Sequence, residues 1–445
     1  MPEGVLAARR DNFADLVQTD RVHGSIYTSQ EIFDAEMARI FHRTWVFVGH
    51  TSELPKPGDF RVARIGRQSV IMVHSTDGEV RVLMNRCRHR GVAMTEEETG
   101  CQKHFVCPYH GWTYDNTGAL ISAPFEDAYG PEWRKEDFGL TPVPRMEIYR
   151  GFVFASLHPS GPTLDEHIRK AKPYIDLFLD ISPVSEIKVL SGATKTLIRA
   201  NWKFVGMDGY HSAYVHHTYL SAMRRRKEAR EAEKAARLGK TEKVDKGGVG
   251  AWTGGSPDNV TRDLGNGHVL LDISPMRRKL YSQFLEELQE RPGGAEYYRS
   301  MVETYGPERA KDILIWEGDP HMGLFPNVQL IQQHIRIIRP VRPDLTEIFM
   351  LPVLLKGVPD EINDARLRKH EDFFGPASKG QPDDTEVFER NQLGLTAEVN
   401  PWVFLGRGLH RERVEPDGTI VGSMRDETTQ RGQLRKWKAL MEQAS

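Results

Sequence analysis

Cysteine is scarce in this chain, since only Cys87, Cys101 and Cys107 occur among 445 residues. So few thiols exclude a disulfide framework and favour a reducing compartment. Long apolar runs are also absent, because no stretch approaches the ~20 apolar residues that a membrane-spanning helix needs. Met1-Pro2-Glu3-Gly4 leads into charged residues rather than into the apolar core of a signal peptide. We therefore expect a soluble, cytoplasmic protein without a membrane partner.

A strong charge imbalance is missing as well. The formal net charge is −2, which gives no electrostatic reason to expect nucleic acid or an anionic membrane as a partner. The length is enough for two or three domains, and no internal repeat or low-complexity tract is visible.

Two short segments combine the few cysteines with histidine. They read Cys87-Arg88-His89-Arg90-Gly91 and Cys107-Pro108-Tyr109-His110-Gly111-Trp112. Two cysteines and two histidines divided in this way can hold a Rieske [2Fe–2S] cluster, with the cysteines on one iron and the histidines on the other. Four such ligands could also bind a structural zinc ion, but zinc modules usually take a Cys-x₂-Cys pair from one loop. The pattern therefore favours the cluster over zinc.

Short β-rich segments with turn residues between them surround these motifs. The clearest are 46–48, 60–65, 69–73, 80–84 and 152–154. Apolar residues at helical spacing precede them in 30–44, with Ser29 as the expected N-cap. We predict a small all-β domain over residues 45–160, inserted after an N-terminal helical part, residues 1–44, that belongs to the larger domain.

The chain becomes mixed after a boundary expected at 156–162, so the predicted fold class is α+β. Residues 161–445 should form the rest of a larger catalytic domain with an antiparallel sheet. Strands are expected at 188–199, 327–338 and 346–355, the last two joined by 340–344, and helices at 164–179, 365–374, 385–392 and 431–442. The charged segment 224–247 is expected to be a solvated helix followed by a mobile loop, with a lid over a pocket as the alternative.

A second set of metal-ligand residues follows later in the chain. Asp208-Gly209-Tyr210-His211 precedes His216-His217, and Asp383-Asp384 comes much later. Two histidines and one carboxylate on one face of Fe(II), with the other positions open, are typical of non-haem iron oxygenases. His211 and His216 would lie about 140° apart around an ideal helix, so we expect a bend near 212–215. Spacing alone does not choose between His216 and His217, and a polar surface patch is the alternative interpretation.

The two centres together are more informative than either alone. A one-electron carrier beside a mononuclear iron implies that electrons are delivered for O₂ activation.

In this order the residues resemble the large (α) subunit of Rieske non-haem iron aromatic-ring-hydroxylating dioxygenases, over almost the whole chain. Besides the two loops, the resemblance rests on Asn201-Trp202-Lys203, Asp208-x-x-His211-x₄-His216 and the Asp383-Asp384 pair. It implies that the [2Fe–2S] cluster is bound by Cys87, His89, Cys107 and His110. It also implies that mononuclear Fe²⁺ is bound by His211, His216 and Asp384, with Asp383 as the alternative if the register differs by one.

Asp208 matches the family's bridging carboxylate. By this resemblance it would link His110 of the partner subunit to His211 of its own chain in a ring of three chains, accepting a hydrogen bond from each imidazole. An acid that stabilises a helix start is the alternative. Only four residues, 204–207, separate Asn-Trp-Lys from Asp208. Relatives usually have several more, so we expect the helix to begin differently here.

The implied reaction uses O₂ and NAD(P)H electrons, supplied by a reductase directly or through a ferredoxin, to hydroxylate an aromatic compound to a cis-dihydrodiol. The implied assembly is a homotrimer, with a small β subunit in many relatives (α3β3). Glu371–Gly375 before Asp383-Asp384 resembles the benzoate branch and favours an aromatic carboxylate as substrate. Gln329, Gln332 or Arg336 could supply its donor, with a solvated strand face as the alternative. A same-family monooxygenase or demethylase, and a Rieske electron-transfer protein without oxygenase activity, are the alternative functions.

Overall fold

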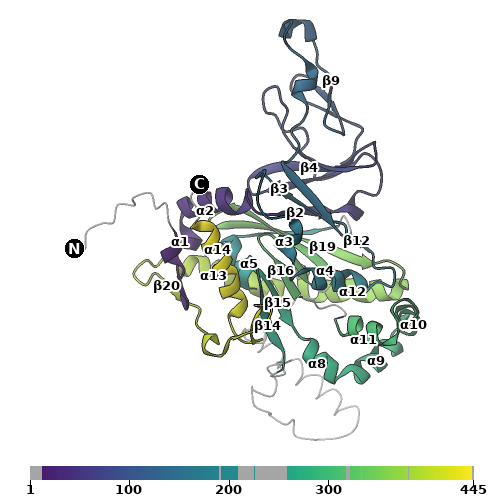
Figure 1. Ribbon diagram of the computed structural model, residues 1–445, viewed down its shortest axis with the longest axis vertical. Coiled ribbons are helices and arrows are strands. Elements are labelled where there is room, and N and C mark those ends of the chain that lie inside the picture. The colour runs from purple at the N-terminus through teal and green to yellow at the C-terminus, as the bar shows by residue number, and fades with distance from the viewer. Residues whose placement is uncertain are drawn as a thin grey trace, which may run out of the picture.

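The computed structural model describes residues 13–189, 192–208, 225, 258–316, 321–331, 333–378 and 380–442. A β-rich domain projects from a larger domain that is built on one wide sheet with helices around it (Figure 1). No helix within the described ranges is both long and apolar enough to cross a membrane. The α+β class and the antiparallel catalytic sheet are therefore as predicted from the sequence.

The helix predicted at 30–44 is present near the start of the described chain. It consists of α2 (Gln30–Glu36), which continues into a π-helical turn, η2 (Met37–Phe41). The Ile32 N–H donates to Ser29 Oγ at 3.4 Å, so Ser29 caps the helix as expected. The buried apolar face of this helix packs into a core that also contains Trp202 and Trp437. The N-terminal helix thus packs against strands of the β-rich domain as well as against α5 (Trp202–Asp208) and α14 (Thr428–Met441).

The β-rich domain contains three small antiparallel sheets among the described residues. The first is β5 (Val80–Met84), β4 (Gln68–His74), β3 (Asp59–Ile65) and β6 (Thr99–Cys101). The second is β7 (His104–Val106), β8 (Thr113–Asp115) and β9 (Leu120–Ser122). The third is β10 (Arg145–Tyr149), β11 (Phe152–Ser156) and β2 (Val46–His50). The strands expected in this region are all confirmed.

The strand β4 shows how this domain is attached. Successive side chains of a strand point to opposite faces. Ile71 and Val73 accordingly lie in a core of the β-rich domain itself, whereas Val70 and Met72 lie in the core shared with α2 and the larger domain. Because both faces of β4 are buried, its sequence is a continuous apolar run rather than an alternating one.

The larger domain is built on a ten-stranded sheet in which neighbouring strands are antiparallel. Its strands are β12 (Ile187–Val189), β13 (Thr194–Ile198), β14 (Val260–Gly265), β15 (His268–Asp272), β16 (His321–Leu324), β17 (Val328–Ile331), β18 (His334–Arg342), β19 (Leu345–Leu355), β21 (Arg413–Val414) and β22 (Ile420–Ser423). The order runs β12-β19-β18-β17-β16-β15-β14-β22-β21, and β13 also pairs with β19.

Three predictions about these strands are wrong in detail. The single strand expected at 327–338 is two strands, β17 and β18, which fold back on each other. The connection expected at 340–344 is shorter, because Arg342 pairs with Leu345 and only Pro343-Asp344 remain as the turn. The strand expected at 188–199 is divided into β12 and β13, which pair with different parts of β19. The first break, at Gln332-Gln333, is not marked by polarity because the strands beside it also contain polar residues, whereas Pro343-Asp344 and Ser191-Gly192 are ordinary turn residues.

Helices cover the sheet and its edges (Figure 1). They include α3 (Leu164–Ile168), α4 (Lys172–Asp180), α5 (Trp202–Asp208), α8 (Ser274–Lys279), α9 (Tyr281–Glu290), α10 (Gly294–Tyr305), α11 (Pro307–Ile315), α12 (Asp360–Phe374), α13 (Gln381–Gly394) and α14 (Thr428–Met441). The helix expected at 164–179 is divided into α3 and α4, and the break precedes Pro173, which lies in the first turn of α4. The three later helices expected from the sequence are present as α12, α13 and α14.

Candidate metal centres

The two Cys-His loops have the same backbone hydrogen-bond pattern. The Gly91 N–H donates to Cys87 O at 3.1 Å, and the Gly111 N–H donates to Cys107 O at the same distance. In both loops the cysteine N–H donates to the carbonyl oxygen of the residue that follows the glycine, Val92 in one and Trp112 in the other, at 2.8 Å. The φ angles of the two glycines are +80° and +71°, a left-handed conformation that residues with a side chain rarely adopt. The loops are therefore two copies of one turn.

These loops place the cysteines inside and the histidines outside. Cys87 and Cys107 are 2% and 3% exposed, and burial, with a contribution from the neighbouring Cys87 side chain, raises the pKa of the Cys107 thiol. His89 and His110 are partly exposed, with ring centroids 4.6 Å apart. The two cysteines thus lie together in the interior and the two histidines lie together nearer the surface. A cluster with both cysteines on one iron and both histidines on the other requires this separation.

The donor set fits a two-iron cluster better than a single ion. Among the described residues, no three Cys, His, Asp or Glu side chains are grouped so that they could hold one metal ion. A zinc ion would instead draw its four ligands to about 2.0–2.3 Å from one point. In the described part of the chain His110 Nδ1 is buried and has no hydrogen-bond partner, which is costly unless a metal or another unseen group satisfies it. The residues present therefore fit the Rieske cluster.

Tyr114 was missed by the sequence motifs but completes the buried side of this site. Its Oη lies 3.3 Å from Cys87 Sγ and accepts a hydrogen bond from the Arg88 N–H at 3.0 Å. Burial raises the pKa of Tyr114, so the phenol keeps its proton. Trp112, which is also buried, stacks on His89, with centroids 5.0 Å apart and 9° between the rings. Tyr114 follows Trp112 by two residues, so strand alternation puts both on the same face, and this signal could have identified Tyr114.

The Asn201-Trp202-Lys203 motif anchors the start of α5. Asn201 Oδ1 accepts a hydrogen bond from the Lys203 N–H at 3.1 Å, as an N-cap does. The side-chain amide of Asn201 also donates to Tyr27 O at 3.1 Å and to Pro343 O at 2.8 Å. The helix therefore begins directly at Trp202 and ends at Asp208.

A buried ion pair holds the same helix in place. Lys203 Nζ lies 2.6 Å from Glu36 Oε1, and both side chains are 0% exposed. Burial lowers the pKa of Lys203, and the Glu36 carboxylate opposes this effect. The indole N–H groups of Trp202 and Trp437 donate to the same carboxylate at 2.8 and 2.7 Å. Because the carboxylate is paired and hydrogen-bonded, its burial between α2, α5 and α14 is tolerated.

The residues expected at the mononuclear iron are only partly described. His211, His216 and the alternative His217 lie outside the described residues, as do the expected bend at 212–215 and nearly all of the charged segment 224–247. The backbone of Asp208 ends α5. Asp384 lies beside Asp383 in the first turn of α13, and its N–H donates to Gly380 O at 3.1 Å. The assignment of iron ligands therefore remains a prediction.

A buried polar network joins α5 to α13 across the sheet. Gln329 Nε2 donates to Val205 O at 2.7 Å. Arg336 donates through Nη1 to Gln329 Oε1 at 3.1 Å and through Nη2 to Gln381 Oε1 at 3.0 Å. Val205 lies in α5, and Gln381 begins α13. The network thus fixes both helices that carry the predicted carboxylates at one place on the sheet.

This network changes the interpretation of the strand that was expected to bind an anion. Gln329 and Arg336 are 0% and 5% exposed, so the alternative of a solvated strand face is wrong for both. Both side chains are engaged with other protein groups rather than displayed on an open surface. Gln332 lies outside the described residues.

Two neutral histidines lie next to Arg336. His334 Nδ1 and His370 Nδ1 are 3.2 Å apart, and both rings contact Phe374, with centroids 4.6 and 6.0 Å from it. Burial lowers the pKa of His370 to about 4 and that of His334 well below its ordinary value, and the Arg336 cation adds to both effects. Near neutral pH this region is therefore an aromatic wall with uncharged imidazoles.

Comparison with known proteins bears on these centres. Residues 44–144 match the family described as Rieske [2Fe-2S] domain. The chain is 32% identical over 400 residues to the large subunit of anthranilate 1,2-dioxygenase from Acinetobacter baylyi, which covers 88% of this chain and 81% of the relative. It is 31% identical to the large subunit of 2-halobenzoate 1,2-dioxygenase from Burkholderia cepacia, covering 92% of this chain and 86% of the relative.

Two further similarities extend this result. The chain is 30% identical to the α subunit of an N,N-dimethyl phenylurea N-demethylase from a Sphingobium species, over 89% of this chain and 85% of the relative. A solved structure of naphthalene 1,2-dioxygenase with indole in the active site has the same fold, with a TM-score of 0.79 and 24% identity over 98% of this chain and 95% of the other.

Proposed function

This chain belongs to the Rieske aromatic-ring-hydroxylating dioxygenases as a large (α) subunit, and on that basis we propose that it cis-dihydroxylates an aromatic carboxylate. As such a subunit it is a terminal oxygenase that contains a Rieske [2Fe–2S] domain. The observation that supports the substrate class is that anthranilate and 2-halobenzoate, which name two relatives, are both aromatic carboxylates.

The site residues have distinct roles in this proposal. Cys87, His89, Cys107 and His110 hold the cluster, and His211, His216 and Asp384 hold the mononuclear iron. When bound, the cluster supplies single electrons and the iron binds and activates O₂. Asp208 accepts hydrogen bonds from His211 and from His110 of the partner subunit, so that it orients both rings. The chain itself fixes these groups, positions the substrate and excludes competing reactions.

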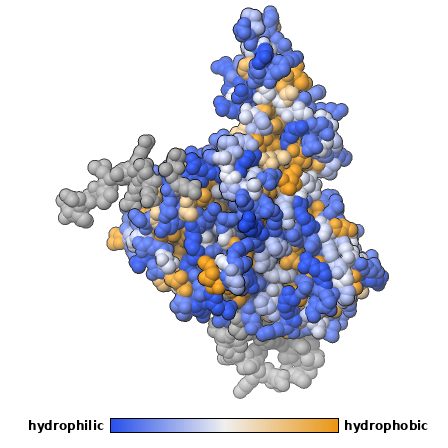
Figure 2. All heavy atoms as spheres, viewed as in Figure 1, coloured by the Kyte–Doolittle hydropathy of each residue, from blue (hydrophilic) through white to orange (hydrophobic). Residues whose placement is uncertain are grey.

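The proposal requires protein partners at the β-rich domain. An NAD(P)H-dependent reductase, directly or through a ferredoxin, supplies the electrons, and two further copies of the chain complete the ring, with or without a small β subunit. Figure 2 shows hydrophobic residues on the surface of the projecting domain. Phe125 and Tyr109, in the domain that carries the partly exposed histidines, are 82% and 55% exposed. Exposed aromatic side chains of this kind favour a binding surface.

Metal content and one substitution test the two-centre assignment. The purified protein should contain about three irons per chain, because a [2Fe–2S] cluster and one mononuclear iron add to three. Two irons per chain would indicate an electron carrier, and a colourless zinc protein would contradict both interpretations.

Asp208→Ala should keep the visible spectrum of the cluster while product formation is nearly abolished. Retained turnover would remove the bridging role.

Product analysis tests the substrate class. With ¹⁸O₂ and a reductase, benzoate should yield a cis-dihydrodiol that carries two labelled oxygen atoms, and its turnover should exceed that of naphthalene. Faster turnover of the neutral arene would contradict the carboxylate assignment.

A demethylase is the second candidate function, because a relative of similar identity has that activity in its name. The same assay separates the two, since demethylation of a dimethyl phenylurea would release formaldehyde and leave the ring without new hydroxyl groups.

A further inference from the structure

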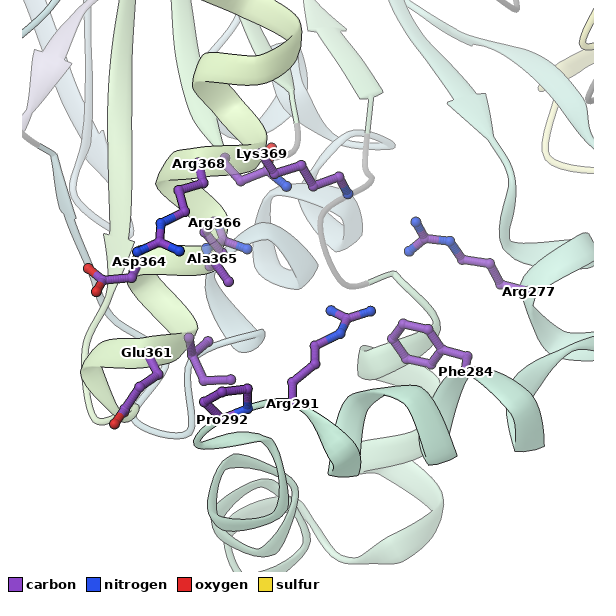
Figure 3. A pocket seen from close by; sticks show the side chains of 12 residues that line it. Arg277, Phe284, Arg291, Pro292, Glu361, Asp364, Ala365, Arg366, Arg368 and Lys369 are labelled. Carbon is purple, nitrogen blue, oxygen red and sulfur yellow. The ribbon is translucent and has the colours of Figure 1, made fainter. Parts of the chain in front are cut away.

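A cavity of about 480 Å³ lies between α8, α9 and α12 at the edge of the catalytic sheet (Figure 3). Its volume is in the range typical of small-molecule sites. Arg291, Arg368 and Lys369 on its wall are exposed, so the cavity opens to solvent.

The lining of this cavity is strongly cationic. Its positive side chains are Arg277, Arg291, Arg366, Arg368 and Lys369. Two carboxylates also belong to the lining, but they point away from the hollow into which Arg277 and Arg291 point (Figure 3). Arg291 and Arg368 form no ion pair with any described residue. Because the whole chain has a net charge of −2, this excess of positive charge is a local feature.

An apolar surface lies beside these charges. Phe284, Pro292 and Ile362 line the same cavity, and the Arg277 guanidinium lies 5.9 Å from the centre of the Phe284 ring. A cavity with cations on one side and apolar side chains on the other is suited to a flat aromatic molecule that carries a carboxylate.

A buried amide provides a further polar contact. Gln333 lines the cavity and is only 2% exposed, and its Oε1 has no hydrogen-bond partner among the described residues. A buried polar atom without a partner is unfavourable unless a water or ligand satisfies it. Gln333 Oε1 can therefore accept a hydrogen bond from a donor group on a molecule inside the cavity, such as an amino group on the ring.

One face of α12 connects this cavity with the predicted iron site. Arg366, His370 and Phe374 follow at intervals of four residues, so they lie along one side of the helix over about 12 Å. The Arg336 guanidinium lies 5.5 Å from the centre of the Phe374 ring and donates to Gln381 at the start of α13. A continuous row of buried side chains thus leads from the cavity to the helix that carries Asp384.

We propose that this cavity is an entry site that binds the carboxylate of aromatic acids and concentrates them beside the catalytic sheet. The inference rests on the proposed function, because it names how that substrate class is selected. Arg291, which points into the hollow, attracts the carboxylate, Arg368 at the rim adds positive charge, and the apolar wall accepts the ring. Since the cavity is separated from Asp384 by the row on α12, it governs substrate capture rather than the chemical step.

Steady-state kinetics of the holoenzyme with its reductase tests this proposal. In Arg291→Met/Arg368→Met, KM for benzoate should rise about three- to tenfold while kcat changes little, because charged entry sites act mainly on the encounter rate. KM for toluene, a neutral ring of similar size, should stay unchanged. The dependence of the benzoate KM on salt should also weaken, since screening acts on the charges that were removed.

Control variants separate this effect from a change in net charge. Arg169→Met/Arg299→Met removes two exposed arginines that do not line the cavity, so its kinetics with benzoate should match the parent. Arg291→Lys/Arg368→Lys keeps the charge and should restore most of the lost affinity. Isothermal titration of the oxidised holoenzyme with benzoate, and with inorganic phosphate as competitor, reports binding without turnover.

The outcomes test the substrate class and the entry site separately. If the parent enzyme does not oxygenate benzoate, the proposed substrate class is wrong. If it does so and the double Met variant keeps the parent KM and binding affinity, the entry site is wrong. Competition by phosphate at equal concentration would also overturn the proposal, because it would indicate a general anion site without selection for the ring.

Discussion

The two regions that carry the predicted metal ligands are built in opposite ways. All four predicted cluster ligands lie within residues 87–110, in two loops with the same hydrogen-bond pattern. The region of the predicted mononuclear iron is assembled from α5, α13 and β17–β18, and its anchoring ion pair reaches back to Glu36. The first site is formed by local turns, whereas the second depends on the packing of the whole larger domain.

This difference separates two ways in which a protein holds a metal site. The cluster loops need only a glycine with positive φ and a small sheet behind each of them. The iron region needs buried polar groups that satisfy one another across elements far apart in sequence. Such networks are unfavourable when they are only partly satisfied, so damage there should spread further than damage in the loops.

The largest expected effect is on turnover and comes from the predicted iron ligand. Asp384→Ala should lower product formation by more than about 100-fold, the upper end of what outer partners of a metal contribute, while the cluster spectrum is unchanged. Asp383→Ala is the matched control and should keep most activity. Iron content and visible absorption measure both results. An inactive Asp383→Ala beside an active Asp384→Ala would move the ligand by one residue.

The next effect is on stability and concerns the anchor of α5. Lys203→Met should destabilise the larger domain by about 3–5 kcal/mol, because it leaves the Glu36 carboxylate buried without its ion-pair partner. The colour of the cluster should persist at low temperature, since the loops do not depend on this pair. Denaturant unfolding followed by circular dichroism gives the free energy. Simultaneous loss of the colour would show that the two regions are not independent.

A smaller effect is expected on acidification. Burial lowers the pKa of His268 to about 4, so the native state keeps this imidazole neutral while the unfolded chain binds a proton below pH 6.5. The free energy of unfolding is therefore unaffected by this histidine above pH 6.5. It falls by about 3 kcal/mol as the pH is lowered from 6.5 to 4. Thermal unfolding between pH 8 and pH 4 measures this. The His268→Gln variant should be less stable than the parent at pH 7, but its unfolding temperature should decrease less as the pH is lowered.

The smallest effect is expected at the cluster loops. Tyr114→Phe removes the hydroxyl beside Cys87 Sγ, a hydrogen bond worth about 1 kcal/mol. Loss of a hydrogen bond to a ligand sulfur should lower the reduction potential of the cluster by about 40 mV, the one-electron equivalent of about 1 kcal/mol. Protein-film voltammetry measures the shift, and unfolding should change little. An unchanged potential would exclude Tyr114 as a donor to the cluster.

The sequence was a good guide to the fold where patterns are local. Ser29 and the helix after it, the strands β3 to β5 and the two Cys-His loops were all predicted. Errors arose where a strand contains buried polar residues, as in β17 and β18, because Gln329 and Arg336 inside the strands look no different from the glutamines at the turn. Tyr114 was missed because it is one aromatic residue among many until β8 is seen to place it beside Cys87.

For this protein, the sequence alone determined the cluster loops, the family and the order of the elements, because these depend on short motifs and on the period of apolar residues. Only the tertiary structure showed that Lys203 is neutralised by Glu36, that Arg336 connects two helices through glutamines, and that α12 faces a cationic cavity. Each of these depends on which side chains from distant segments become neighbours. Local spacing carries no information about such contacts, and packing of the complete sheet decides them.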